Sequence, residues 1–138
     1  MKFIWISSLF IASLLHAETS ALFIGNSYSG QIRKSFVNLV KHEKRPLHVE
    51  FKTPGGWTLT KHLADQKTTE LINSRQWSYV VLQEQSQTPA YSNLRGNFFE
   101  ASKELAQLIK KQKSIPLFYM TWGRRDGDKQ NITVAPTY

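Results

Sequence analysis

Ser27 is the side chain best placed for covalent chemistry in this sequence. It follows a short apolar run, residues 21–24, that ends at Gly25, and it opens a stretch with helical apolar spacing. A hydroxyl at that point faces the unpaired N–H groups and positive dipole of a helix N-terminus, where an oxyanion is stabilised. An ordinary N-cap formed by Ser27 or Ser29 fits the same position. Position alone leaves both interpretations open and favours the cap.

The spacing around Ser27 excludes several other phosphate-binding or nucleophilic loops. Residues 25–30 match neither a dinucleotide-binding fingerprint nor a P-loop, and Ser29 stands where a nucleophile elbow has its second glycine. The chain has no cysteine, so any nucleophile must be an oxygen and no disulfide or thiolate site forms. No histidine and carboxylate cluster has metal-ligand spacing, so we expect neither a metal nor another cofactor.

The elements that must position Ser27 alternate along the chain. Apolar runs predict strands at residues 21–24, 79–82 and 116–121, and alternating apolar and polar residues predict a strand at 47–52. Apolar periodicity predicts helices around residues 32–40, 58–75 and 94–113. Strands separated by helices imply parallel βαβ units, hence an α/β fold of three layers. Ligands bind such sheets outside the carboxyl ends of the strands. The polar loops at those ends therefore form the candidate site.

These loops contain several side chains with two plausible roles. Trp57 and Trp122 are either core or rim aromatics, or an apolar wall for an acyl or sugar group. Residue types alone do not separate these alternatives. Glu84 is interpreted as a strand-end charge paired with Arg124 or Arg125.

Three segments together resemble a known family, the SGNH/GDSL-type serine hydrolases. LFIGNSYS at residues 22–29 is similar to the first block of that family, GGWT at 55–58 to the second, and VVLQEQSQ at 80–87 to the third. The turn at residues 122–124 and residues 136–138 resemble a branch with glutamine-rich third blocks. The resemblance implies a flavodoxin-like SGNH hydrolase fold over residues 18–138.

The resemblance also implies roles for individual residues. Ser27 would be the nucleophile, and the oxyanion would be held by the N–H groups of Ser27 and Gly56 and by the side-chain amide of Gln87. The third block departs from the usual Gly-x-Asn-Asp pattern, with Gln85 in the glycine place and Gln87 in the asparagine place. The residues expected to line the substrate are Asn26, Trp57, Gln85, Trp122 and Arg124.

The fourth block of the family, an Asp-x-x-His that supplies the base, is not in the sequence. The candidates His42 and His48 fall at the wrong edge of the sheet, and His62 is more plausibly a surface or packing residue. We therefore expect a domain truncated at its C-terminus, with little esterase activity and poor stability.

The N-terminus predicts export. Lys2, the apolar residues 3–15 and Ala17 form a signal-peptide pattern, with cleavage near Ala17 and no retained membrane anchor. The protein would then be periplasmic or secreted, with one domain at residues 18–138. The formal charge of +8 is spread over many segments, so we expect no nucleic-acid partner, although anionic envelope polymers suit such a surface.

Two classes of function remain at this stage. The first is an exported ester hydrolase that removes acyl or acetyl groups from carbohydrate or lipid esters. The second is a noncatalytic carbohydrate-binding module or an inactive truncated remnant, which keeps the cleft without the base. A small-molecule or polysaccharide ester is the expected partner of the first class.

Overall fold

The computed structural model describes residues 18–44 and 46–121. The elements, in chain order, are β1 (Thr19–Ile24), α1 (Ser27–His42), β2 (Leu47–Lys52), α2 (Leu59–Ala64), α3 (Gln66–Asn73), β3 (Tyr79–Leu82), α4 (Ser92–Lys111) and β4 (Ile115–Phe118). The predicted signal peptide, residues 1–17, lies outside the described residues. No helix in the described ranges is long and apolar enough to cross a membrane.

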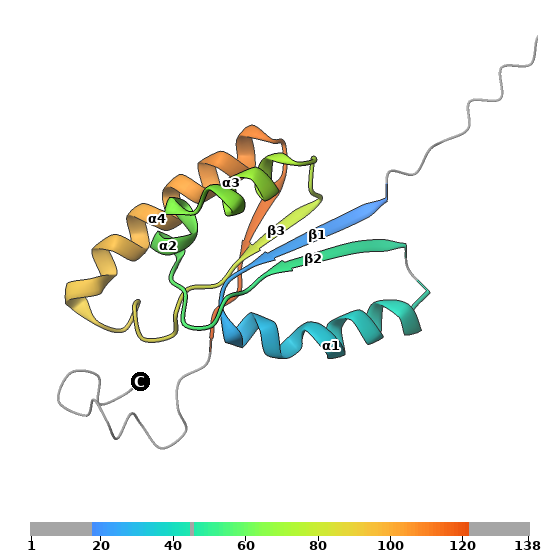
Figure 1. The fold of residues 1–138 in the computed structure, drawn as a ribbon, viewed down its shortest axis with the longest axis horizontal. Coiled ribbons are helices and arrows are strands. Elements are labelled where there is room, and N and C mark those ends of the chain that lie inside the picture. Colours follow the sequence, from blue (N-terminus) through green and yellow to red (C-terminus); the bar gives the residue numbers. More distant parts are fainter. Residues whose placement is uncertain (1–17, 45, 122–138) are drawn as a thin grey trace, which may run out of the picture.

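The four strands form one parallel sheet in the order β2-β1-β3-β4. α1 lies on one face of this sheet, and α2, α3 and α4 lie on the other (Figure 1). In the last row of the sheet, Ile24 pairs with Lys52 and Leu82, and Leu82 pairs with Phe118. All four strands therefore end together, and their loops emerge at one edge. The predicted three-layer α/β fold with a parallel sheet is confirmed.

The strand order has a switch point between β1 and β3. The chain leaves β1 for β2 in one direction and leaves β3 for β4 in the other. In open α/β sheets a crevice forms at such a point, outside the carboxyl ends of the two strands. Residues 25–29, the Ser27 turn, follow β1, and residues 83–91, the glutamine loop, follow β3. Residues 53–58, the glycine loop, follow β2 beside them.

Each face of the sheet has its own apolar packing. Leu22 and Ile24 of β1 belong to the main core, which lies under α2, α3 and α4 and includes fully buried Trp77. On the α1 face, the Phe23 ring stacks on Phe51 at 4.5 Å between ring centroids and meets Phe36 edge-on at 5.1 Å. Aromatic pairs of this kind are worth about 0.5–1.5 kcal/mol beyond their buried area. Both faces of β1 are thus held, which fixes where the Ser27 turn begins.

The helix predicted over residues 58–75 is two helices, which corrects the sequence prediction. Asp65 ends α2 and begins α3, with extended backbone at φ −89° and ψ 111°. Its carboxylate accepts the Thr68 N–H at 3.0 Å and the Thr68 hydroxyl at 2.8 Å, and it pairs with Lys52 at 3.1 Å. The hydrogen bonds by which Asp65 caps α3 and its ion pair with Lys52 stabilise the break more than a continuous helix would be stabilised at this residue. β4 also ends at Phe118, before the predicted residue 121.

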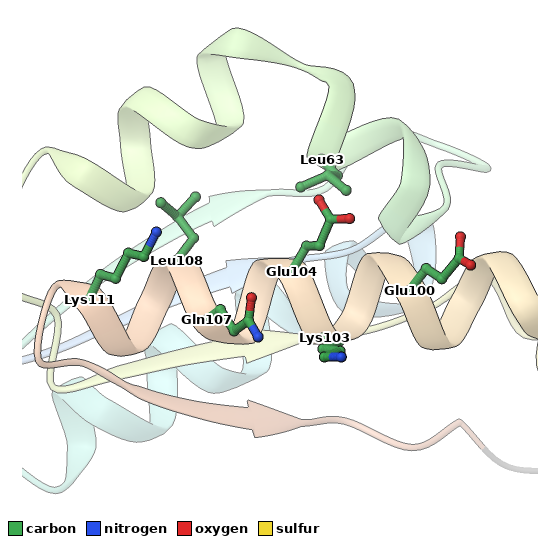
Figure 2. Close-up of a pocket in the computed structure, with 7 residues that line it drawn as sticks. All are labelled: Leu63, Glu100, Lys103, Glu104, Gln107, Leu108 and Lys111. Carbon is green, nitrogen blue, oxygen red and sulfur yellow. The ribbon is translucent and has the colours of Figure 1, made fainter.

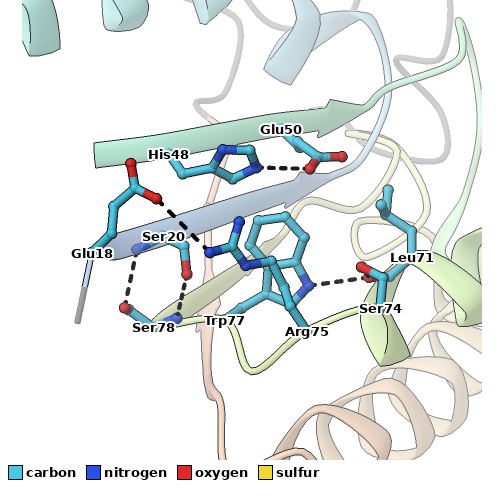
Figure 3. A network of polar contacts seen from close by, with 9 residues as sticks. All are labelled: Glu18, Ser20, His48, Glu50, Leu71, Ser74, Arg75, Trp77 and Ser78. Carbon is cyan, nitrogen blue, oxygen red and sulfur yellow. Dashed lines mark hydrogen bonds and ion pairs between the residues drawn. The ribbon is translucent and has the colours of Figure 1, made fainter. Parts of the chain in front are cut away.

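Polar contacts tie the strand starts together at the opposite edge of the sheet (Figure 3). Ser20 and Ser78 exchange hydrogen bonds, each backbone N–H donating to the other hydroxyl at 3.0 and 3.1 Å. The Trp77 indole N–H donates to the Leu71 carbonyl at 3.1 Å, and the Arg75 guanidinium lies 5.3 Å from the Trp77 ring centroid. These contacts hold the strand starts in register. None of the candidate site residues takes part in them.

β4 is an edge strand with an apolar surface. Ile115, Leu117, Phe118 and Met120 are all exposed large hydrophobic residues. Pro116 stands within the strand, where a residue without an N–H is tolerated at an edge. An open strand edge with apolar side chains can pair with other chains. This edge is therefore the surface of the described chain most prone to self-association.

Leu117→Thr should reduce concentration-dependent aggregation of the protein. Leu117 is 44% exposed, so its replacement should change the free energy of unfolding by less than about 1 kcal/mol. Light scattering on concentration and a thermal melt measure the two effects. The matched control is Leu105→Thr, at a fully buried position, which should cost at least about 2 kcal/mol. Aggregation unchanged in Leu117→Thr would show that another surface drives association.

Candidate active site

Ser27 is the first residue of α1, and its side chain is exposed. The N-cap is Asn26, with extended backbone at φ −129° and ψ −152°, and its Oδ1 accepts the Tyr28 N–H at 3.1 Å. The interpretation of Ser27 or Ser29 as the helix cap is therefore wrong. Asn is an equally good capping residue, and it stands one position earlier. Because Asn26 caps the helix, the Ser27 hydroxyl is released from that task.

Gln83 anchors the Ser27 turn from the end of β3. Its side chain is fully buried, and its Oε1 accepts three hydrogen bonds: from Asn26 N at 3.0 Å, Ser29 N at 3.3 Å and Ser29 Oγ at 3.0 Å. Its Nε2 donates to the Glu84 carbonyl. Gln83 was not among the residues predicted for the site. The available signal was a polar residue directly after a buried strand, at the edge where the polar loops meet.

The first-turn amides of α1 are unequally satisfied. The Asn26 and Ser29 amides donate to Gln83, and the Tyr28 amide donates to Asn26. Within residues 18–44 and 46–121, the Ser27 N–H has no acceptor. The exposed Ser27 hydroxyl thus lies at the positive end of the α1 dipole, next to one free N–H group.

The glycine loop is tied to the Ser27 turn by Asn26. Asn26 Nδ2 donates to the Trp57 carbonyl at 2.9 Å, and the Trp57 N–H donates to the Pro54 carbonyl at 3.4 Å. Gly56 has φ +69°, which favours glycine, and it is exposed. In the described part of the chain its N–H has no acceptor. Asn26, predicted to line the substrate, is instead 2% exposed and uses its amide to support the site.

The glutamine loop is organised by Gln85. Its Oε1 accepts from Gln87 N at 2.8 Å, Thr88 N at 3.1 Å and the Thr88 hydroxyl at 3.3 Å. The Gln87 carbonyl accepts from Ala90 N and Tyr91 N, which fixes the backbone of Gln87. Gln85 was also predicted to line the substrate, but its side-chain oxygen accepts hydrogen bonds from its own loop. The oxyanion role of Gln87 stays a prediction.

Glu84 joins the end of β3 to the start of α2. It is buried, and its carboxylate accepts the Leu59 N–H at 3.2 and 3.3 Å and the Gln85 N–H at 2.5 Å. Burial raises the pKa of Glu84 above its ordinary value, and the N–H groups of Gln85 and Leu59 partly offset this. The alternative pairing with Arg124 or Arg125 concerns residues outside the described ranges. Glu84 thus positions α2 behind the glycine loop.

His62 supports the turn from within the core. The fully buried ring donates from Nε2 to the Gly25 carbonyl at 2.8 Å, and Nδ1 lies 3.1 Å from the Thr68 hydroxyl. Burial lowers the pKa of His62 below its ordinary value, and the hydrogen bond to Gly25 offsets part of this effect. Since both ring nitrogens have partners, neither is available to Ser27. The packing interpretation of His62 fits this geometry.

Trp57 is the one predicted wall residue in the described part of the chain. Its ring is half-buried, with Lys52 Nζ 5.5 Å from the ring centroid and the His62 ring 5.0 Å away. Such packing suits both a rim aromatic and one side of a binding surface. Trp122 and Arg124 lie outside the described residues.

A groove elsewhere on the molecule contains none of the candidate site residues. It has a volume of about 640 Å³ and is lined by Leu63 of α2 and one side of α4. Figure 2 shows Glu104 of α4 pointing toward Leu63, among other charged side chains of that helix. Over the described residues, no group of three or more His, Cys, Asp or Glu side chains could hold a metal ion.

Gly25→Ala should distort the Ser27 turn and destabilise the protein. A Cβ at Gly25 would lie 2.6 Å from Gln83 Oε1 and 2.9 Å from Ser29 Oγ, closer than real contacts allow. We expect a loss of about 1–3 kcal/mol in the free energy of unfolding, measured by denaturant titration. Gly96→Ala is the control, because it meets nothing within 4 Å in α4 and should stabilise by about 0.5–1 kcal/mol. Equal effects of the two changes would contradict the tight contact.

His62 should make the protein less stable as the pH falls. Its pKa is lowered in the folded state, so below its ordinary value of 6.5 the unfolded chain binds the proton more readily. The free energy of unfolding should therefore decrease from about pH 8 toward about pH 5. His62→Gln, which can still donate to the Gly25 carbonyl, should flatten this decrease.

Denaturant titrations across that range test the contribution of His62. Glu84 has a raised pKa and acts with the opposite sign, since its stabilising effect is lost as the pH rises, but it is present in both proteins. The difference between the two profiles isolates His62. His42→Gln, at an exposed ring, is the control and should follow the unmodified protein. Parallel profiles for His62→Gln and the unmodified protein would refute the assignment.

The comparisons with known proteins identify the fold. No family model and no curated protein matches the chain. A provisionally assigned SGNH hydrolase from Slackia heliotrinireducens has a similar structure, with a TM-score of 0.69 and 24% identity over 83% of this chain. A DUF4886 family protein from Bacteroides uniformis is similar with a TM-score of 0.60 and 15% identity, also over 83%. The chain spans 62% and 54% of the lengths of these two structures. The described chain therefore has an SGNH-hydrolase-like fold.

Proposed function

We propose that this chain carries the nucleophile and oxyanion parts of an exported SGNH-type ester hydrolase, with Ser27 as the nucleophile. One observation carries the proposal: Ser27 is exposed at the switch-point edge, and its own N–H is left free when the neighbouring first-turn amides are taken. The similarity of the fold to a provisionally assigned SGNH hydrolase supports it. The reaction is acyl transfer to serine followed by hydrolysis.

In the first step the Ser27 oxygen attacks the ester carbonyl carbon. The new C–O bond forms as the carbonyl electron pair moves onto oxygen, and the hydroxyl proton passes to a base. The N–H groups of Ser27 and Gly56, with the Gln87 amide, would hold the resulting oxyanion. Collapse of this intermediate breaks the bond to the alcohol, which leaves with a proton. Water then attacks the acyl-serine, releases the acid and restores Ser27.

The proton acceptor is not among the histidines of the described chain. His62 has partners on both ring nitrogens, His48 pairs with Glu50 at 2.8 Å, and His42 stands at the far end of α1. We therefore propose that the base is an imidazole other than those of His42, His48 and His62, as in the Asp-x-x-His block that the resemblance implies. The N–H groups of Ser27 and Gly56 and the Gln87 amide would stabilise the negative charge of the oxyanion, but they would not remove the proton from the Ser27 hydroxyl.

The substrate proposal rests on the surface around the site. An acyl or acetyl ester of a carbohydrate or lipid would place its apolar part against Trp57, which is half-buried beside Gly56. Export to the periplasm or medium, proposed from residues 1–17, would bring the protein to envelope and extracellular esters. We propose no nucleic-acid partner, no membrane anchor after cleavage and no cofactor.

A noncatalytic binding module is the second candidate. The observation that favours it is the Ser27 hydroxyl itself, which has no hydrogen-bond partner within residues 18–44 and 46–121. A serine without a base is a weak nucleophile at neutral pH. Such a site could still bind an ester or carboxylate through its N–H groups.

Free imidazole should separate the two candidates by supplying the missing base. We expect the mature chain alone to hydrolyse p-nitrophenyl acetate slowly, and imidazole to raise the rate in proportion to its concentration. Ser27→Ala should remove this protein-dependent increase, because only the nucleophile can form the acyl-enzyme. The measurement is the initial release of p-nitrophenol.

Ser27→Ala with the same imidazole is also the control for hydrolysis by imidazole itself. Mass spectrometry of the reacting chain should find the acetyl group on Ser27. A rate in Ser27→Ala equal to that of the unmodified chain would exclude Ser27 as the nucleophile. The binding-module interpretation would then be the stronger one.

A further inference from the structure

We propose that Gln83 is a positioning residue that leaves the Ser27 N–H as the free donor at the start of α1. The inference rests on the proposed function, since it concerns how the oxyanion donor is selected. Gln83 is fully buried, follows β3, and faces the turn after β1. Gln83 itself does not touch the substrate in this proposal.

The N-terminus of a helix presents several unpaired N–H groups. An oxyanion could approach any of them unless the others are occupied. Gln83 Oε1 accepts hydrogen bonds from the backbone N–H groups of Asn26 and Ser29, at 3.0 and 3.3 Å. These two residues lie on either side of Ser27 in the sequence. Asn26 Oδ1 takes the Tyr28 amide. Two side-chain oxygens therefore occupy three amides, and the Ser27 N–H remains.

The neutral amide of Gln83 suits this task better than other side chains of similar size. Its Nε2 donates to the Glu84 carbonyl, which fixes the orientation of the group so that Oε1 faces the turn. A carboxylate could accept the three hydrogen bonds but could not donate to Glu84, and it would add a buried charge beside the Glu84 side chain. A methionine would fill the volume without any comparable acceptor.

The fit around Gln83 Oε1 is close on every side. Ser29 is fully buried, and its hydroxyl donates to the same oxygen at 3.0 Å. Gly25 approaches so closely that a Cβ there would lie 2.6 Å from it. Removing Gln83 would leave two amides and a hydroxyl without their acceptor, at about 1–3 kcal/mol for each buried group. The turn would then rearrange to satisfy them, and Ser27 would move with it.

The test compares Gln83→Met with Gln112→Met in the full chain. Both changes remove a glutamine that makes a side-chain hydrogen bond, but Gln112 donates to Asn73 Oδ1 at 2.8 Å at the C-terminal end of α4 and does not contact the Ser27 turn. The first readout is amide hydrogen exchange by NMR. Exchange at Asn26 and Ser29 should accelerate in Gln83→Met, while Gly30, which donates to the Asn26 carbonyl within α1, stays protected.

The second readout is phosphonylation of Ser27 by an alkyl fluorophosphonate. The Ser27 oxygen forms a bond to phosphorus, fluoride leaves, and the hydroxyl proton goes to added imidazole. The maximal labelling rate, kinact, should fall about 100-fold in Gln83→Met, as expected when a reacting group is displaced by about 1 Å. The half-saturating concentration, KI, should stay within about twofold, because the apolar surface that binds the reagent is unchanged.

Gln83→Asn covers the case in which Gln83→Met does not fold. It keeps the amide but withdraws the acceptor by one methylene, so it should change both readouts in the same direction. Normal kinact in a folded Gln83 variant would overturn the positioning role and leave the proposed function intact. Unchanged exchange at Asn26 and Ser29 would overturn it as well. An unmodified chain that is never labelled at Ser27 would instead refute the proposed function.

Discussion

Every polar group drawn into the edge between β1 and β3 must find a hydrogen-bond partner, and the rest of the site follows from that requirement. The start of α1 places several N–H groups at a buried turn, where each unpaired group costs about 1–3 kcal/mol. Gln83 and Asn26 meet this need with two oxygens. Because they cannot reach every amide, the arrangement leaves one donor at an exposed serine. The proposed oxyanion donor is thus the N–H group that the structural hydrogen bonds leave unpaired.

The parallel sheet makes this arrangement possible. Its four strands end in one row, so three loops from separate parts of the sequence meet within hydrogen-bond distance. Asn26 links the Ser27 turn to the glycine loop, and Glu84 links the glutamine loop to α2 behind the glycine loop. His62 joins the core to the Gly25 carbonyl. The Ser27 turn and the glycine loop are thus each held by a side chain of another loop, and the glutamine loop is held by its own Gln85.

The sequence predicted the strands well because each shows either a short apolar run or an alternation of apolar and polar residues. Residues 47–52 and 79–82 were predicted with the observed bounds. The break at Asp65 was missed, since its cause is a cap and an ion pair with Lys52 from another element. In the site, Ser27 and Gly56 are exposed, and their roles as nucleophile and oxyanion donor stay predictions. Asn26 and Gln85 were assigned to the substrate because a sequence does not show which way a loop amide turns.

In a serine hydrolase site, the nucleophile with its oxyanion donors and the base differ in how many elements of the fold must come together to form them. The proposed nucleophile and oxyanion donors depend on one turn, one helix N-terminus and loops whose strands are adjacent, all within residues 19–91. A base depends only on the position of one imidazole, which can come from any segment that reaches the same edge. His62 illustrates the constraint, because a histidine buried to support Gly25 has no nitrogen left for catalysis. In the proposed site, the Ser27 turn is therefore supported by Gln83, Asn26 and His62 independently of any proton acceptor.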